Sequence, residues 1–147
     1  MDLRRDRVHL QLIGQLVQAG GIDAGTQADI DVVWWFGRLI ANTDMHLGNL
    51  SFRFDAEPGA PAQLRLAPAY DMLPMAYAPL AGGEVPQREF SPPLPLPTQR
   101  PAWAHAFQGA IAYWRRAAMD ERISAPFRQI CRSNGDKLAT LGDQVLA

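Results

Sequence analysis

A mostly apolar stretch that starts near Thr26 or Asp29 and continues to about Ala41 constrains the fold of this 147-residue chain most strongly. Thr26 and Asp29 are residue types that cap helices, so either one predicts a helix start. A helix whose apolar positions cover much of its circumference must be enclosed by other elements. We therefore expect the central helix of a helical bundle, with Gly37 allowing a neighbour to approach closely. Its apolar positions are Ile30, Val33, Trp34, Gly37, Leu39, Ile40 and Ala41.

The predicted central helix runs directly into the polar segment Asn42–Asn49. A rigid helix that ends at a polar loop can fix a side chain and leave it accessible to substrate. Asp44 and Asn49 have the interval of the Asp-x-x-x-x-Asn catalytic loop of protein kinases. In such sites one carboxylate accepts the proton of the attacking hydroxyl, while an amide oxygen and a second carboxylate hold Mg²⁺ against the phosphates. Asp71 is the candidate for that second carboxylate. The interval alone is more typical of ordinary turns, in which Asn and Asp are common.

Two short alternating segments lie between the candidate metal ligands. Leu50–Phe54 and Gln63–Leu66 alternate apolar and polar residues, which predicts two strands, and Asp55–Pro61 has the composition of a turn. Together they predict a small hairpin. Because a hairpin brings its two ends together, Asn49 and Asp71 could share one ion.

Further helices are expected on both sides of this region. Asp6–Ala19 has a mostly helical apolar spacing and ends at a glycine pair. Another helix should run from Pro101 to about Met119, because proline suits a first helical turn and an apolar face follows it. Ser124 could cap a later helix, which Asn134-Gly135 should break before one more helix begins. The apolar residues of that last helix are Leu138, Leu141 and Val145.

The segment Leu73–Pro101 is rich in proline, which excludes a regular helix or a central strand there. We expect a long irregular loop laid over the helical body. Within it, the run Ser91–Pro97 resembles a polyproline ligand. A covering segment that packs on its own protein is the favoured interpretation of the run, because covering loops also use Pro and Leu.

Composition excludes several classes of function. The length fits one domain, and the formal net charge of −1 gives no reason to expect general attraction to nucleic acid or to anionic membranes. Cys131 is the only cysteine, which favours a reducing cytoplasm, and no run of 18 apolar residues or signal peptide is evident. The scattered histidines do not form a zinc pattern. They are His9, His46 and His105.

Two segments carry a family resemblance. Asn42-Thr-Asp-Met-His-Leu-Gly-Asn49-Leu-Ser-Phe, followed by Leu66-Ala-Pro-Ala-Tyr-Asp-Met-Leu-Pro74, resembles the HipA-like serine/threonine kinases, the toxin components of bacterial toxin–antitoxin pairs. The resemblance is densest over about Trp34 to Pro79. It implies a mainly α fold: a helical bundle similar to the C-terminal lobe of the kinase-like HipA fold, with one small β-hairpin. We expect residues 1–147 to form that single domain, with the N-terminal nucleotide-lid lobe absent.

The resemblance also implies roles for single residues. Asp44 corresponds to the catalytic base, and Asn49 and Asp71 to the ligands of Mg²⁺ on bound ATP. His46 is grouped with these two cofactor-binding residues and is expected mainly to brace the loop by hydrogen bonds. Met-Leu follows Asp71 where ordinary kinases have Phe-Gly, which looks like the HipA pattern. Tyr70 is expected to pack beneath Asp71.

Some parts of a kinase are not evident in the sequence. There is no Gly-x-Gly-x-x-Gly or Walker loop, and Lys137 is the only lysine. Whether the chain is an enzyme by itself is therefore open, because the missing lobe would have to be supplied in cis or in trans. The leading hypothesis is ATP- and Mg²⁺-dependent phosphorylation of a protein substrate in a toxin–antitoxin context. The alternative is a non-enzymatic module that regulates transcription with an antitoxin-type DNA-binding protein. A magnesium-dependent phosphodiesterase would need more clustered carboxylates.

Overall fold

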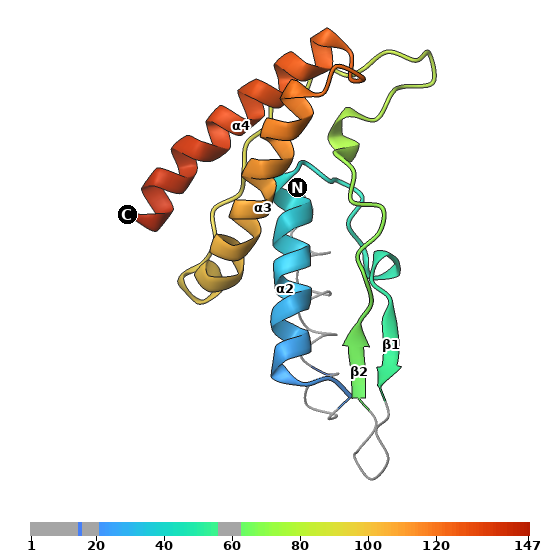
Figure 1. The fold of residues 1–147 in the computed structure, drawn as a ribbon, viewed down its shortest axis with the longest axis vertical. Helices are drawn as coiled ribbons and strands as arrows, with labels where there is room; N and C mark the ends of the chain where they lie inside the picture. Colours follow the sequence, from blue (N-terminus) through green and yellow to red (C-terminus); the bar gives the residue numbers. More distant parts are fainter. Residues whose placement is uncertain (1–14, 16–20, 56–62) are drawn as a thin grey trace.

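The computed structural model describes residue 15 and residues 21–55 and 63–147 (Figure 1). The predicted helix Asp6–Ala19 lies outside these residues, apart from Gln15, which is helical. The elements, in chain order, are helix α2 (Ala24–Leu39), the 3₁₀ turn η1 (Leu47–Asn49), strands β1 (Phe52–Asp55) and β2 (Gln63–Leu66), the 3₁₀ turns η2 (Met75–Tyr77) and η3 (Pro97–Gln99), and helices α3 (Arg100–Met119) and α4 (Ala125–Leu146).

Helix α2 lies between the other helices and the hairpin. Helix α3 packs against α2 on one side and against α4 on the other, while strand β2 contacts α2 from the opposite side (Figure 1). The two strands pair antiparallel, with Phe52 opposite Leu66 and Asp55 opposite Gln63. The expectation of a mainly α fold with one small hairpin is confirmed. The prediction that α2 is the central helix of the bundle is wrong, because α3 is the helix that packs against both of the other described helices. No helix in the described part of the chain is long and apolar enough to cross a membrane.

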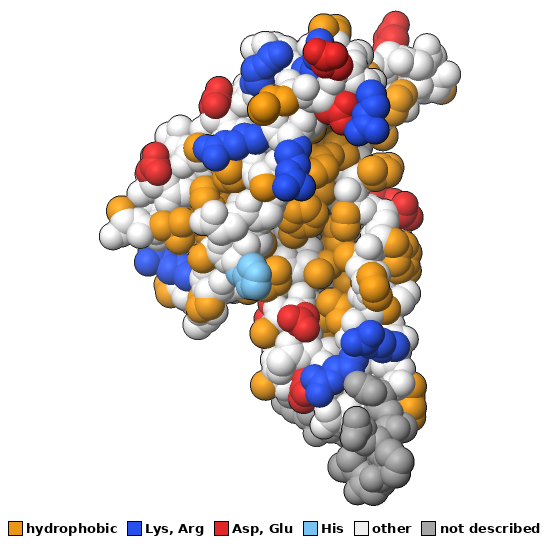
Figure 2. All heavy atoms as spheres, in the orientation of Figure 1, with side chains coloured by type: hydrophobic (Ala, Val, Ile, Leu, Met, Phe, Trp, Pro, Cys, Tyr) orange, Lys and Arg blue, Asp and Glu red, His pale blue; other side chains and the backbone are white. Residues whose placement is uncertain are grey.

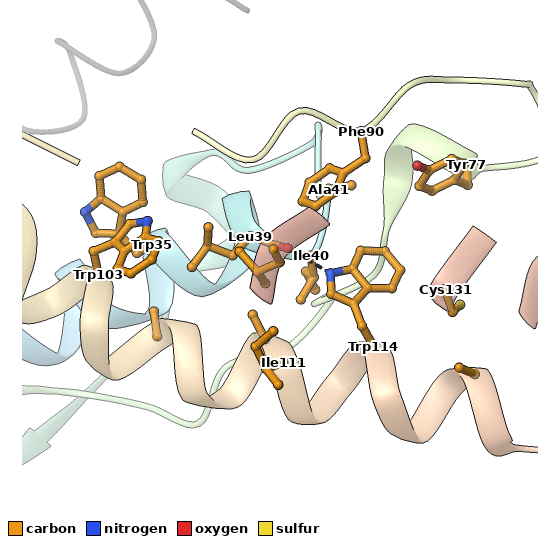
Figure 3. Packing of buried hydrophobic residues seen from close by; sticks show 14 residues of the cluster. Trp35, Leu39, Ile40, Ala41, Tyr77, Phe90, Trp103, Ile111, Trp114 and Cys131 are labelled. Carbon is orange, nitrogen blue, oxygen red and sulfur yellow. Dashed lines mark hydrogen bonds between the residues drawn. The ribbon is translucent and has the colours of Figure 1, made fainter. Parts of the chain in front are cut away.

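The main core combines apolar side chains of α2, α3 and α4 with Tyr77 and Phe90 of the proline-rich segment (Figure 3). Trp103 and Trp114 are completely buried, and burial of such rings stabilises the fold through the large apolar area that they remove from water. The indole Nε1 of Trp114 donates a hydrogen bond of 3.0 Å to the carbonyl of Leu39. This bond satisfies a carbonyl at the end of α2, so the core itself fixes the point from which the polar loop departs.

Helix α2 begins earlier than the sequence predicts, and its N-cap is neither Thr26 nor Asp29. Asp23 is the cap, and its Oδ1 accepts a hydrogen bond of 2.7 Å from the amide of Thr26. The hydroxyl of Thr26 instead donates to the carbonyl of Leu64 on β2. The Thr26 amide, with help from Arg65, holds the pKa of the Asp23 carboxyl below its ordinary value. The cap therefore also ties α2 to the hairpin.

The predicted break at Asn134-Gly135 is wrong, because α4 continues without interruption to Leu146. The Asn134 side chain is buried and its Nδ2 donates a hydrogen bond of 2.9 Å to the hydroxyl of Tyr77. A Cβ on Gly135 would lie 3.4 Å from Cβ of Trp114. These residues therefore serve the close packing of α4 on its neighbours, and the helix accommodates them.

The hairpin is confirmed, although its first strand begins two positions later than predicted. Leu50 is buried beside Ile22 and Ile30 in a second, smaller core cluster, and regular pairing starts only at Phe52. The side chain of Leu50 is thus used to seat the hairpin on α2.

The proline-rich segment is irregular, as expected, apart from the short turns η2 and η3. It covers the core at Phe90, whose ring packs on Trp114 with centroids 5.7 Å apart, and at Pro93, whose carbonyl accepts a hydrogen bond from Trp103. Leu94 and Leu96 project outward, with 68% and 63% of their surface exposed. The segment therefore packs on its own protein at Phe90 and Pro93, while Leu94 and Leu96 remain exposed.

The contact between α3 and α4 predicts the effect of a glycine substitution. An added Cβ on Gly142 would lie only 2.3 Å from Cζ of the Phe107 ring, so Gly142→Ala should destabilise the fold by about 1–3 kcal/mol through overpacking. Gly109 on α3 is the matched control, because an added Cβ there has its nearest neighbour at 3.4 Å. Gly109→Ala should stabilise the helix by about 0.5–1 kcal/mol. Urea unfolding measures both effects, and equal effects of the two substitutions would contradict the packing described.

Candidate active site

The candidate site begins where α2 stops. The amide of Asn42 donates to the carbonyl of Gly37 (2.9 Å), and the amide of Ala41 donates to that of Arg38 (3.3 Å). This pair of bonds is the Schellman motif, which normally places glycine at the position held here by Ala41. Ala41 adopts a left-handed backbone with φ of 61°. The helix therefore ends in a sharp turn that directs the Asn42 side chain away from the helix.

The Asn42 side chain joins two parts of the site. It is buried, its Oδ1 accepts a hydrogen bond of 2.9 Å from the amide of Asp44, and its Nδ2 donates one of 3.2 Å to the carbonyl of Asp71. A single amide group thus connects the backbones of the predicted catalytic base and of the predicted metal-binding carboxylate. This link is not predictable from the sequence, because it depends on a contact between residues 29 positions apart.

The loop alternates between anchored and exposed side chains. Met45 is buried, and an added Cβ on Gly37 would lie 2.6 Å from its sulfur, so Gly37 does allow the close approach that the sequence predicts. Asp44 and His46 on either side of Met45 are exposed. Met45 holds the loop against α2, so the exposed Asp44 carboxylate stands on a fixed backbone. A general base needs this kind of access, because it must reach the hydroxyl of an incoming substrate.

His46 and Gly48 lie against each other at the turn. A Cβ on Gly48 would lie 2.9 Å from the imidazole of His46, so only glycine leaves room for the ring in this arrangement. The carbonyl of His46 accepts a hydrogen bond of 3.0 Å from the amide of Asn49. In the structure, His46 therefore braces the loop through its backbone carbonyl. The predicted role of the imidazole stays a prediction.

Asn49 is the most enclosed of the predicted site residues, with 5% of its surface exposed. Its Oδ1 is buried and accepts no hydrogen bond from the residues that the structure describes. An amide oxygen buried without a partner costs about 1–3 kcal/mol. Such an atom suits a hard cation, which prefers oxygen ligands.

Asp71 has an unusual backbone. Its φ is 55°, in the left-handed region that residues other than glycine seldom adopt. The Asp71 carbonyl accepts hydrogen bonds from Asn42 Nδ2 and from the amide of Leu73, and the carboxylate is exposed. Strained backbone of this kind occurs often at functional sites, where the surrounding structure enforces it.

The chain after Asp71 is fastened to the end of α2. The amide of Ala76 donates a hydrogen bond of 3.0 Å to the carbonyl of Ala41. The next residue, Tyr77, is buried, and its hydroxyl pairs with Asn134 on α4. The turn η2 therefore secures the Asp71 segment to two helices.

The other candidate residues lie elsewhere or act differently from expectation. Tyr70, which was expected to pack beneath Asp71, is 44% exposed, and its hydroxyl donates a hydrogen bond to the carbonyl of Gly48. Lys137 lies on α4, where its Nζ is 3.4 Å from a carboxylate oxygen of Glu89. Among the described side chains, no group of three or more His, Cys, Asp or Glu could hold a metal ion.

A hollow of about 420 Å³ opens between α2, the hairpin and α3. In the space-filling view, hydrophobic side chains gather over α2 between α3 and the hairpin (Figure 2). The predicted site residues do not line the hollow. No local pattern predicts it, because its walls come from several separate segments. The lining residues are Asp29, Val32, Val33, Arg53, Leu66, Ala67, Pro68, Ala69 and His105.

The sequence of this chain matches a known family. Residues 10–134 match the sequence model of the HipA-like C-terminal domain, and the chain belongs to that family. It is similar to Toxin YjjJ of Escherichia coli (strain K12), with 41% identity over 118 residues. The matched region is 80% of this chain and 26% of that protein, so the chain spans about a quarter of the length of the toxin. No solved structure matches the chain.

The bridging role of Asn42 predicts a loss of stability. Asn42→Ala removes both hydrogen bonds and leaves two backbone groups without their partner, so the free energy of unfolding should fall by about 1–3 kcal/mol. Thr43→Ala is the matched control, because the Thr43 side chain is exposed and surface substitutions change stability by about 0.5 kcal/mol or less. Chemical denaturation measures both variants. Equal stabilities would show that the Asn42 bridge contributes nothing.

The left-handed backbone of Asp71 predicts a difference between two substitutions that both remove the carboxylate. Asp71→Gly should be more stable than Asp71→Ala by about 1 kcal/mol, because only glycine adopts a φ of 55° without steric cost. The melting temperatures of the two variants measure this difference. An Asp71→Ala variant at least as stable as Asp71→Gly would contradict the backbone conformation described.

Proposed function

We propose that this chain is the C-terminal catalytic half of a HipA-like protein serine/threonine kinase. The reaction would transfer the γ-phosphoryl group of ATP to a serine or threonine hydroxyl of a protein substrate, with Mg²⁺, in a toxin–antitoxin context. Membership of the HipA-like C-terminal domain family and similarity to a toxin support the context. The observation that carries the catalytic proposal is the buried Asn49 Oδ1, which has no partner among the described residues and lies on the same loop as Asp44.

The donor set fits magnesium. Asn49 Oδ1 and the Asp71 carboxylate would hold the ion, and a small hard cation can keep several waters and take its remaining ligands from phosphates. When bound, Mg²⁺ neutralises charge that develops on the phosphate oxygens. A cation at Asn49 would also offset the cost of burying an unpartnered amide oxygen.

Asp44 would act on the substrate hydroxyl. Its exposed carboxylate accepts the hydroxyl proton as the hydroxyl oxygen forms a bond to the γ-phosphorus. The bond between that phosphorus and the β–γ bridging oxygen breaks, and its electron pair leaves with ADP. Asn42 holds the amide of Asp44 and the carbonyl of Asp71, so it would fix the base relative to the metal-binding segment.

The groups that grip the nucleotide are proposed to come from another lobe, in cis or in trans. A kinase requires a phosphate-binding lysine, and Lys137 is positioned instead by Glu89 and the carbonyl of Phe90. Toxin YjjJ is about four times as long as the region that matches this chain, so it has room for such a lobe. Because ATP is a cytoplasmic substrate, we place the reaction in the cytoplasm.

A chimera tests the proposal. The matched segment of Toxin YjjJ is replaced by the corresponding part of this chain, and transfer of ³²P from labelled ATP to protein is measured. Asp44→Asn should lower turnover about 10²–10⁴-fold with Mn²⁺ binding retained, because it removes only the base. Asp71→Asn and Asn49→Ala should lower both turnover and Mn²⁺ binding. Thr43→Ala is the control and should leave both unchanged.

Other outcomes would contradict the proposal. Full transfer by the Asp44→Asn and Asp71→Asn chimeras would refute the assigned roles. Calorimetry on the unsubstituted chimera, which includes the rest of Toxin YjjJ, gives a second test, since heat on adding Mg²⁺ and ATP supports the kinase proposal. Tight binding of an antitoxin-type DNA-binding protein without any heat from nucleotide would favour the non-enzymatic regulatory module.

A further inference from the structure

The Tyr70 hydroxyl makes a contact that the proposed reaction does not use. It donates a hydrogen bond to the carbonyl of Gly48 and lies 3.3 Å from Oγ of Ser51, which donates to it. A phenolic hydroxyl can donate one hydrogen bond and can also accept. Both capacities are used, and both partners flank Asn49 in the sequence.

The hairpin brings Tyr70 to this position. Phe52 lies opposite Leu66 in the antiparallel pair, and the amide of Ala67 donates to the carbonyl of Ser51 (2.8 Å) one step beyond it. The chain that enters β1 and the chain that leaves β2 therefore run side by side past the end of the sheet. Before Ser51 the chain turns as η1, and the Tyr70 hydroxyl reaches the Gly48 carbonyl within this turn.

Gly48 lies in a crowded part of the loop. It stands between the His46 imidazole, which an added Cβ would meet at 2.9 Å, and the buried amide of Asn49. The other described hydrogen bond of this turn is local, from the Asn49 amide to the His46 carbonyl. Tyr70 therefore provides a long-range anchor near the end of the loop, as Asn42 does at its start.

We propose that Tyr70 is a positioning residue that fixes the distance between the metal-binding oxygens of Asn49 and Asp71. Tyr70 is the neighbour of Asp71 in the chain, and its hydroxyl bonds Gly48, the neighbour of Asn49. One residue therefore fixes the positions of both proposed ligands relative to each other. Tyr70 acts through the backbone of Gly48 and has no part in the chemical step. The inference rests on the proposed function, in which these two residues hold Mg²⁺.

The experiment is a Mn²⁺ titration of the full chain, followed by electron paramagnetic resonance, which distinguishes free from bound ion. Tyr70→Phe removes the hydroxyl and retains the ring, and it should weaken Mn²⁺ binding about tenfold, since partners that orient metal ligands contribute about 10–100-fold to affinity. Ser51→Ala should weaken binding less. The matched control is Tyr113→Phe on α3, whose ring packs edge-to-face on Phe36 of α2, and this change should leave affinity unchanged.

Hydrogen exchange of the same variants reports the anchor without metal. Tyr70→Phe should speed exchange of the amides from 45 to 50 and leave α3 and α4 unchanged, whereas general destabilisation would speed exchange in the helices as well. Unchanged loop exchange, or Mn²⁺ affinity equal to that of the unsubstituted chain while Asn49→Ala loses binding, would overturn the positioning role. If Mn²⁺ binds neither to the unsubstituted chain nor to the chimera with ATP present, the proposed function fails, and loop exchange alone then decides whether the anchor exists.

Discussion

The site depends on the side-chain amide of one buried asparagine. Asn42 follows directly after the turn that ends α2, and it bonds the backbone of Asp44 with its oxygen and that of Asp71 with its nitrogen. Each contact is an ordinary hydrogen bond, but together they close a loop between segments 29 positions apart. The core contributes to the same point, because Trp114 bonds the carbonyl of Leu39 just before the turn. Aromatic packing between α2 and α3 therefore sets the place where the polar loop leaves the helix.

Patterns that are local in sequence predicted much of this fold. The apolar circumference of α2, the face of α3 and the alternation in the two strands each reflect a single element, and all three elements are present. The motif residues are likewise close in sequence, so the loop that carries Asp44 and Asn49 could be found without knowledge of the fold. Whether these residues act in catalysis stays a prediction.

The wrong predictions concern residues whose roles are decided at long range. Thr26 has the chemistry of a cap, but its hydroxyl bonds the carbonyl of Leu64 and the preceding Asp23 takes over the cap. Asn134 with its glycine resembles a helix break, yet its side chain is buried against Tyr77, which is 57 positions away. In each case the polar side chain, which the sequence pattern predicts to cap or to end a helix, instead makes a hydrogen bond with a distant residue. The contact of Tyr70 with Gly48 was missed for the same reason.

The turn after α2 has a consequence for the order of folding. Ala41 takes the left-handed conformation that glycine would adopt freely, so local preference does not favour this turn. Its carbonyl is bonded by Ala76, and the following Asn42 is bonded to Asp71, so its stabilising partners arrive only when distant chain segments dock. Contacts between distant segments carry the entropy cost of closing a long loop before they contribute. We therefore expect the nascent chain to form α2, α3 and α4 first, and to assemble the polar loop in its final shape only at the last stage.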